Sequence, residues 1–252
     1  MMTIGEYKSG ARAMLLGNYS VCIAAILLGE AISAVASMVF LNPGRGNFGS
    51  MIYLISSLII LLLTGVLHAG YKTMYLHIAR KQDAAVTDIF FCFKNHADRA
   101  LSVLALLIVI SFVCSLPFLA LLYFISGMRI TRELSIMIPL AVPGRTLLIL
   151  AAWACFLVFV NIRFVLVFYI YADDPYQGTM FYLSESQKLM QGNMLRFLKL
   201  QLSFLGYALL CLLTFGIGLL WLIPYIHVSN AGFYDTVLKS RVSDPFEEST
   251  LS

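Results

Sequence analysis

Apolar residues along the chain gather in runs of about the length that crosses a bilayer. The runs are Val21 to Leu41, Met51 to about Gly70, Ala100 to Ile125, Thr146 to Tyr171, and a stretch of about 40 residues from Phe197 to Val237. One spanning helix needs about 20 such residues, so the last stretch is long enough for two. Gly216-Ile217-Gly218 in its middle predicts a tight turn, because glycine adopts positive φ without strain. We therefore expect six spans, with five as the alternative.

Composition supports the membrane interpretation and excludes most soluble classes. Hydrophobic residues make up 60% of the chain and charged residues 12%, and the mean hydropathy is +0.88. A soluble domain has about 25% charged residues. The net charge of +4 comes without a dense basic face interleaved with aromatic residues, so we expect no nucleic-acid partner. The fold class is predicted to be all-α, a polytopic membrane helical bundle forming one domain over residues 1–252.

The loops differ in basic content, which predicts orientation. With the N-terminus inside, few basic residues fall outside, namely Arg45, Arg129, Arg132 and Arg145. The cytoplasmic segments then hold Lys8, Arg12, Lys72, Arg80, Lys81, Lys94, Arg99, Lys188, Arg196, Lys199, Lys239 and Arg241. This is the positive-inside pattern, and six spans place both termini in the cytoplasm. The first run resembles a signal peptide and contains small residues that could form a cleavage site. Its apolar character continues past these residues, which favours an uncleaved span.

A short amphipathic segment precedes each odd-numbered span. The segments are Tyr7 to Asn18, Val86 to Asn95 and Ser184 to Asn193, and we expect them to lie in the cytoplasmic interface of the membrane. Two of them end in Gly-Asn, a helix stop that uses the left-handed conformation. We interpret the chain as three parallel helix-plus-hairpin repeats over residues 1–80, 81–172 and 173–241, with a polar tail at 242–252. Chance similarity among apolar sequences is the alternative.

Ionisable residues inside spans are costly and are therefore candidates for function. Glu30 in the first span and Arg163 in the fourth lie at similar predicted depth, and we expect them to form an ion pair with Asn161 nearby. The pair would be either a structural clamp or a binding site for an anionic group that uses the remaining donors of the arginine. A snorkelling Arg163 is the third alternative.

The other candidate binding residues lie near the ends of the second and last spans. His68 and His227 are intramembrane histidines, which are more often hydrogen-bonded core residues than ligands. Pro224 should kink the last span and free a carbonyl near Tyr225, and Asn230 follows in the same span. Asp173-Asp174-Pro175 predicts a helix start, with aspartate as the N-cap and proline in the first turn.

No motif for catalysis, metal or cofactor binding is recognisable. Nucleophile elbows, P-loops, dinucleotide fingerprints and paired catalytic carboxylates do not occur. His77, Asp83, Asp88 and His96 share one loop but lack the spacing of a zinc site. We predict no catalytic residue, no metal and no cofactor.

A pattern of motifs covers essentially the whole chain and is most specific in its last third. It combines Ser186-x-x-Leu189-Met190-x-Gly192-Asn193, Thr214-x-Gly216-Ile217-Gly218-x-x-Trp221-x-x-Pro224-Tyr225 and Ala231-x-Phe233-Tyr234. The pattern resembles a family of bacterial multipass membrane proteins catalogued as domain of unknown function 975. Tyr207 stands where that family usually has tryptophan, and Asp174 where it has asparagine. The resemblance implies the bacterial plasma membrane (inner membrane) and carries over no activity.

These observations favour a non-enzymatic membrane protein that binds a lipid or another amphiphile, or that acts as a scaffold. A small-solute or lipid transporter is the alternative, and an intramembrane enzyme is the third candidate. The expected partners are membrane lipids, with other membrane proteins or a second copy of the chain as further candidates.

Overall fold

The computed structural model describes residues 3–40, 47–126, 129–130, 136–137 and 144–242. These residues are almost entirely helical, as predicted. The elements are α1 (Ile4–Leu15), α2 (Tyr19–Phe40), α3 (Asn47–Ala79), the 3-10 helix η1 (Val86–Phe90), α4 (Phe91–Lys94), α5 (Ala97–Ser126), β1 (Arg129–Ile130), β2 (Ile136–Met137), α6 (Gly144–Ile162), α7 (Val167–Asp173), α8 (Thr179–Met190), α9 (Met194–Leu202), α10 (Leu205–Leu213) and α11 (Leu219–Val242). Residues 41–46, which follow the first apolar run, and the polar tail beyond residue 242 lie outside the described residues.

Five candidate spans, found within the described residues, are long and apolar enough to cross a membrane. They are Tyr19–Met38, Gly49–Ala79, Ala97–Leu122, Thr146–Asp173 and Met194–Leu213. The membrane interpretation is therefore confirmed at this level. The expected sixth span coincides with α11, a helix of 24 residues that is less apolar and does not join this set.

The second apolar helix is longer than the sequence pattern predicts. The predicted apolar run ends at about Gly70, but α3 continues to Ala79. Apolar side chains at Met74, Tyr75 and Ile78 are almost fully buried, so tertiary packing extends the helix through this partly polar segment. Lys72 is consequently a helical residue within the folded unit.

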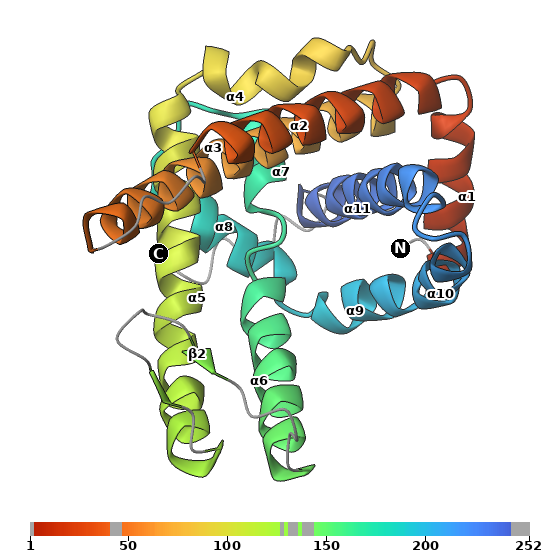
Figure 1. Ribbon diagram of the computed structural model, residues 1–252. Helices are drawn as coiled ribbons and strands as arrows, with labels where there is room; N and C mark the ends of the chain where they lie inside the picture. Colours follow the sequence, from red (N-terminus) through yellow and green to blue (C-terminus); the bar gives the residue numbers. More distant parts are fainter. Residues whose placement is uncertain (1–2, 41–46, 127–128, 131–135, 138–143, 243–252) are drawn as a thin grey trace, which may run out of the picture. The chain divides into compact units, whose positions relative to one another are not determined.

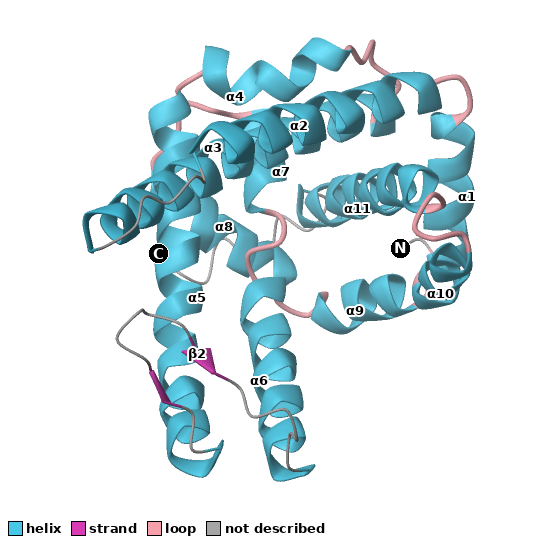
Figure 2. Cartoon of the chain, in the orientation of Figure 1, coloured by secondary structure: helices cyan, strands magenta, loops and turns pink. Residues whose placement is uncertain are grey.

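The chain forms two compact units, Met1–Leu104 with Leu166–Ser252, and Ala105–Val165. The smaller unit consists of antiparallel helices, most of α5 and α6 (Figure 2). Ser111 donates to the Asn161 amide oxygen at 3.2 Å, and the Trp153 indole donates to the Ser115 hydroxyl at 3.3 Å. Strands β1 and β2 form a two-stranded antiparallel ladder in the connection. The rest of this connection lies outside the described residues.

In the larger unit, α3 and α11 run parallel to each other. Lys72 contacts His227, and Arg80 contacts Asp235, so both contacts join residues that are 155 positions apart. A constant separation of this kind requires two helices with the same direction. The short helix α7 packs against α3 and contributes Tyr169, whose ring stacks on that of Tyr234 at 5.8 Å.

The three predicted amphipathic segments are helical, and each packs on a different helix. Helix α1 packs on α11, η1 on α3, and α8 on α7 (Figure 1). The predicted helix stops are confirmed at Gly17 and Gly192, which have φ of 93° and 74°. In the middle segment the left-handed residue is His96 rather than Asn95.

Of two further predictions from local sequence signals, one is confirmed and one is wrong. The turn between α10 and α11 is confirmed, with positive φ at Phe215 and Gly216. The helix start predicted at Asp173-Asp174-Pro175 is wrong, because Asp173 ends α7 and the N-cap of α8 is Gly178. Aspartate and proline are equally typical of turns, and the Asp174 carboxylate here accepts from the Tyr176 N–H at 3.0 Å.

Candidate functional site

A cavity of about 350 Å³ lies within the larger unit between α1, α2, α10, α11 and the turn that joins the last two helices. Its size falls in the range of small-ligand sites, roughly 300–1,000 Å³. The lining combines one cation and several hydroxyl groups with apolar side chains: Arg12, Tyr19, Tyr207, Leu210, Cys211, Thr214, Gly218, Trp221, Leu222 and Tyr225.

The polar end of the cavity is built around Arg12. Helix α1 begins with a capping box between Thr3 and Glu6, and places Arg12 opposite α10 and α11. The guanidinium donates to the Tyr225 hydroxyl at 3.1 Å and to the Tyr207 hydroxyl at 2.8 Å. Both tyrosines, Tyr225 foremost, raise the pKa of Arg12, which keeps the guanidinium charged.

A second cation stands one helical turn before Arg12. The Lys8 ammonium donates to the Ser203 carbonyl oxygen at 2.7 Å and lies 5.0 Å from the centre of the Tyr207 ring. Partial burial lowers the pKa of Lys8. In the part of the chain that the structure describes, neither Lys8 nor Arg12 forms a salt bridge with a carboxylate. The polar end is therefore a pair of cations without an internal counter-ion.

The apolar end depends on close packing at the α10–α11 turn. A side chain at Gly218 would place its Cβ 2.7 Å from the Cys211 sulfur, so any larger residue there would force Cys211 to shift. Thr214 bonds the turn internally, accepting from the Gly218 N–H at 3.1 Å. Leu210 and Trp221 remain exposed, so the apolar wall is accessible from the lipid-compatible surface of the helices.

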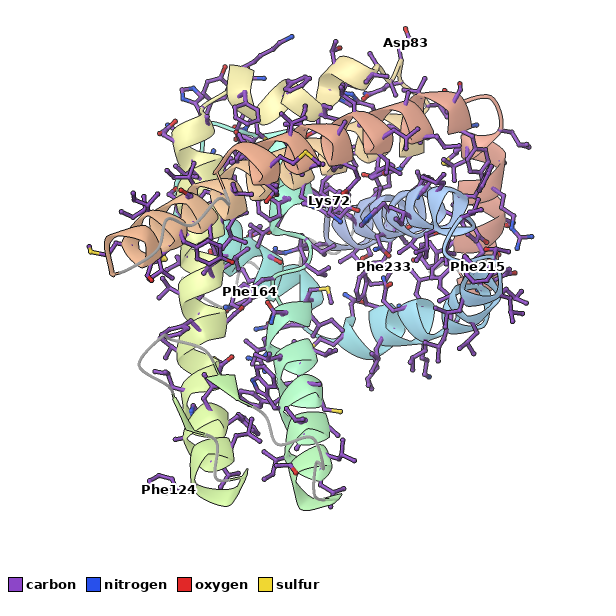
Figure 3. The ribbon with its side chains drawn as sticks, in the orientation of Figure 1. Lys72, Asp83, Phe124, Phe164, Phe215 and Phe233 are labelled. Atoms are coloured by element: carbon purple, nitrogen blue, oxygen red, sulfur yellow. The ribbon has the colours of Figure 1, made fainter. Side chains whose placement is uncertain are left out.

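A second polar cluster joins α3, α7 and α11. Figure 3 labels Lys72 in this cluster. Its Nζ lies 2.8 Å from His227 Nδ1 and 5.5 Å from the centre of the Tyr169 ring. The His227 ring stacks on Tyr75 at 5.0 Å. His68 lies one turn before Lys72, within electrostatic range of Lys72 and of Glu30 on α2. This cluster places several titratable groups inside the folded unit.

A third cluster fastens the ends of the same three helices. Arg80 at the end of α3 pairs with Asp173 of α7 and, at 2.7 Å, with Asp235 of α11. The Tyr234 hydroxyl also donates to Asp173, at 2.6 Å. Hydrogen bonds from Arg80 to Asp173, with Asp235 contributing, raise the pKa of the guanidinium. Because both carboxylates bond to the Arg80 guanidinium, the cluster ties the ends of α3, α7 and α11 together, and we interpret it as a structural junction.

Comparison with known proteins shows the family to which the chain belongs. A family model described as "Protein of unknown function (DUF975)" matches residues 1–241. The chain belongs to the DUF975 family. The resemblance inferred from the sequence motifs is confirmed, and the match covers nearly all of the chain. No curated protein and no solved structure matches it, so the function has to be inferred from the site itself.

The structure distributes the predicted site residues of this DUF975 member over several places. Tyr225 lines the cavity and Pro224 precedes it in α11. His227 joins Lys72, whereas Asn230 accepts from the Gln201 side-chain amide at 2.6 Å.

The predicted pair of Glu30 and Arg163 remains a prediction. Glu30 belongs to the larger unit and Arg163 to the smaller one. Arg163 lies in the turn between α6 and α7, with its guanidinium carbon 5.1 Å from the centre of the Phe159 ring. Asn161 accepts from Ser111 in the same unit.

Sequence reasoning missed the residues that form the polar end of the cavity. Lys8 and Arg12 were counted only as cytoplasmic charges, and Tyr207 only as a departure from the family pattern. The spacing of Lys8 and Arg12, four residues apart on one helical face, was a usable signal. Their convergence with Tyr207 and Tyr225 depends on long-range packing, which one sequence does not show.

No metal site was found among the described residues. No group of three or more His, Cys, Asp or Glu side chains there could hold a metal ion. The lining of the cavity offers a ligand hydrogen bonds, positive charge and apolar contact.

Proposed function

We propose that this DUF975 protein binds an anionic amphiphile, with the headgroup at Arg12 and one hydrocarbon chain in the cavity between α10 and α11. The observation that supports the proposal is one cavity whose lining is cationic at one end and apolar along its wall. Ligand sites typically combine an apolar lining with a few placed polar groups. No catalytic role is included in this proposal.

The membrane arrangement that goes with this function has six spans, α11 being the sixth, in a bacterial plasma membrane with both termini in the cytoplasm. Helix α1 then lies in the cytoplasmic interface, which places Arg12 at headgroup depth. The three-repeat organisation belongs to the same proposal. It is supported by the parallel course of α3 and α11 and by the left-handed glycines after α1 and α8.

Trp221 provides a test, because it lines the cavity. The chain has two tryptophans, so Trp153→Phe leaves Trp221 as the single tryptophan, which can be excited selectively over the tyrosines. An anionic amphiphile brominated in its hydrocarbon chain should quench Trp221 saturably at near-stoichiometric amounts in detergent, and the unbrominated amphiphile should reverse the effect.

The matched variants remove one positive charge each. Arg12→Gln should weaken the quenching by about tenfold, the size expected for loss of one strong charged contact. Lys94→Met removes an exposed charge outside the cavity lining and should leave quenching unchanged. Quenching that rises linearly and is equal in all three proteins would show bulk lipid contact only, and would refute the proposal.

Proton-linked transport is a second candidate, favoured by the cluster at Lys72 and His227. An N···N distance of 2.8 Å accommodates one proton between the two bases, because two protonated donors facing each other would repel. Intramembrane groups of this kind often mark ion or proton pathways. Glu30 of α2 and His68 of α3 would continue the pathway.

A pH step across proteoliposomes with an entrapped pH-sensitive dye tests this candidate. Proton entry should exceed that of protein-free vesicles and should fall to that level in Lys72→Met and His227→Gln. Lys94→Met should retain the wild-type rate. Entry no faster than in protein-free vesicles would eliminate proton-linked transport.

A further inference from the structure

The donors at the polar end of the cavity specify the headgroup more closely than its charge alone. Arginine has five N–H donors and no acceptor, and two of those on Arg12 serve Tyr225 and Tyr207. Lysine has three donors, and one on Lys8 serves Ser203. Both cations therefore retain N–H groups for a ligand.

The two tyrosines add donors rather than acceptors. Each phenol oxygen already accepts from Arg12, and within the described residues nothing accepts the O–H of Tyr207 or Tyr225. Because the arginine N–H occupies one side of each oxygen, the phenol proton turns elsewhere. The polar end thus presents two cations and two hydroxyl donors, with Glu6 engaged in its own capping box.

A set composed of donors matches a group composed of acceptors. A phosphate has three or four oxygens and accepts charge-assisted bonds from Arg and Lys. A carboxylate has two oxygens and a single charge, and would leave one of the two cations uncompensated. A phosphate monoester carries up to two negative charges, which equals the charge of Lys8 and Arg12 together.

We infer that the headgroup bound at Lys8 and Arg12 is a phosphate monoester on a lipid, preferred over a phosphodiester. This inference rests on the proposed function, because it names the ligand class of the same cavity. Arg12 and the tyrosines hold the phosphate oxygens at the mouth, Lys8 neutralises the second charge, and one acyl chain occupies the apolar wall.

The second negative charge predicts a pH dependence. The second pKa of a phosphate monoester is about 6. The titratable groups that face or flank the cavity are Lys8 and Arg12 from α1, Tyr19 from α2, Tyr207 and Cys211 from α10, and Tyr225 from α11. Cys, Tyr, Lys and Arg side chains ordinarily titrate at about pH 8 or higher. The ligand is therefore the group that changes charge between pH 5 and pH 7.5 or so.

Native mass spectrometry of the full chain in gentle detergent tests the inference. Phosphatidic acid, a monoester, and phosphatidylglycerol, a diester, are supplied in equal amounts with identical acyl chains. At about pH 7.5 the monoester should be retained about tenfold more, and the preference should shrink as the pH falls to about 5. Lys8→Met should remove the preference, whereas Lys8→Arg and Lys94→Met should keep it.

The outcomes separate this inference from the proposed function. Equal retention of both lipids that still depends on Arg12 would overturn the monoester assignment and leave the proposed function in place. Retention of neither lipid would refute both. Displacement of phosphatidic acid by equimolar inorganic phosphate would overturn the lipid assignment in favour of a free phosphate compound.

Discussion

At the scale of single residues, Gly70 shows how tightly the larger unit is packed. Gly70 lies on α3 where the helix meets η1, and a Cβ atom there would be 1.9 Å from the Ile89 carbonyl oxygen. That oxygen belongs to backbone and cannot rotate away. Gly232 on α11 stands in the matching Ala-Gly-aromatic sequence, but nothing lies within 4 Å of its Cβ position.

The two glycines, Gly70 and Gly232, give a prediction with an internal control. Gly70→Ala should lower the free energy of unfolding by about 1–3 kcal/mol, as overpacking does. Gly232→Ala should raise it by about 0.5–1 kcal/mol, because alanine is the better helix former. Thermal unfolding in one detergent measures both, and equal effects of the two substitutions would contradict the close approach of α3 to η1.

Arg80 is the residue on which the junction of α3, α7 and α11 depends. Arg80→Met should lower the free energy of unfolding by about 1–3 kcal/mol, because it leaves two carboxylates without their charged donor. The Arg80 side chain is 29% exposed, which keeps the expected cost below that of a fully buried pair.

The control for Arg80 is Arg241, which pairs with Glu185 and whose side chain is more exposed than that of Arg80. Arg241→Met should cost no more than about 1 kcal/mol, as is usual for surface pairs. Chemical or thermal unfolding of both variants provides the comparison, and an Arg80→Met protein as stable as Arg241→Met would show that the junction is not structural.

Residue types alone did not predict these roles. Arg80 was predictable as a charge in a cytoplasmic loop, but its partners are 93 and 155 positions away. Tyr225 was named because it follows Pro224, yet its contact with Arg12 spans 213 positions. Contacts over such separations depend on helix packing, which local patterns do not encode.

At the scale of elements, the connection between α7 and α8 contains a pH-sensitive turn. The Asp174 carboxylate accepts from the Gln177 side-chain amide at 2.8 Å and from the Tyr176 N–H at 3.0 Å. Gln177 first, and then the Tyr176 N–H, hold the pKa of Asp174 below its ordinary value of 3.8. A carboxyl whose pKa is lowered by folding stabilises the fold above its unfolded pKa, and that contribution is lost as the pH falls.

Asp174→Asn tests the turn, since the amide keeps one acceptor oxygen but does not titrate. Wild type should melt at a higher temperature than the variant near neutral pH. The difference should shrink as the pH falls below about 4, where the carboxyl becomes neutral. A difference in melting temperature that stays constant from about pH 7 to pH 3 would argue against the turn.

Elements were predicted best where composition and local chemistry agree. The apolar runs gave the positions of α2, α5 and α6, and the Gly-x-Gly signal gave the turn between α10 and α11. The end of α3 was not predicted, because the polar residues Lys72 and His77 interrupt the apolar run. The burial of Met74, Tyr75 and Ile78 shows that this segment is nevertheless packed as a helix. Asp173 was misassigned because the same residues favour helix starts and turns.

At the scale of the whole molecule, the number of spans sets the orientation of the termini. Six spans place both ends on one side, and five place them on opposite sides. Two reporter domains, one active only inside the cell and one active only outside, are fused in turn to each end. At both ends the inside reporter should be active and the outside reporter inactive. An outward C-terminus would show that α11 does not cross the membrane, and would remove the six-span arrangement.

The sequence predicted the membrane class and the DUF975 family but not the cavity. Class follows from composition, and family follows from motifs concentrated in the last third of the chain. The cavity requires α1 to meet α10 and α11, which are separated from it by most of the sequence. Neither the apolar pattern nor the charge asymmetry contains that information.

The central claim is that one hydrocarbon chain of an anionic amphiphile occupies the cavity beneath Arg12. The most direct measurement is a crystal structure of the protein with an anionic amphiphile brominated along that chain, analysed by anomalous scattering. The account predicts a bromine peak beside Leu210, Trp221 and Leu222, weaker in crystals of Arg12→Gln that are soaked at the same amphiphile concentration. Bromine found elsewhere on the apolar surface, with an empty cavity, would contradict it.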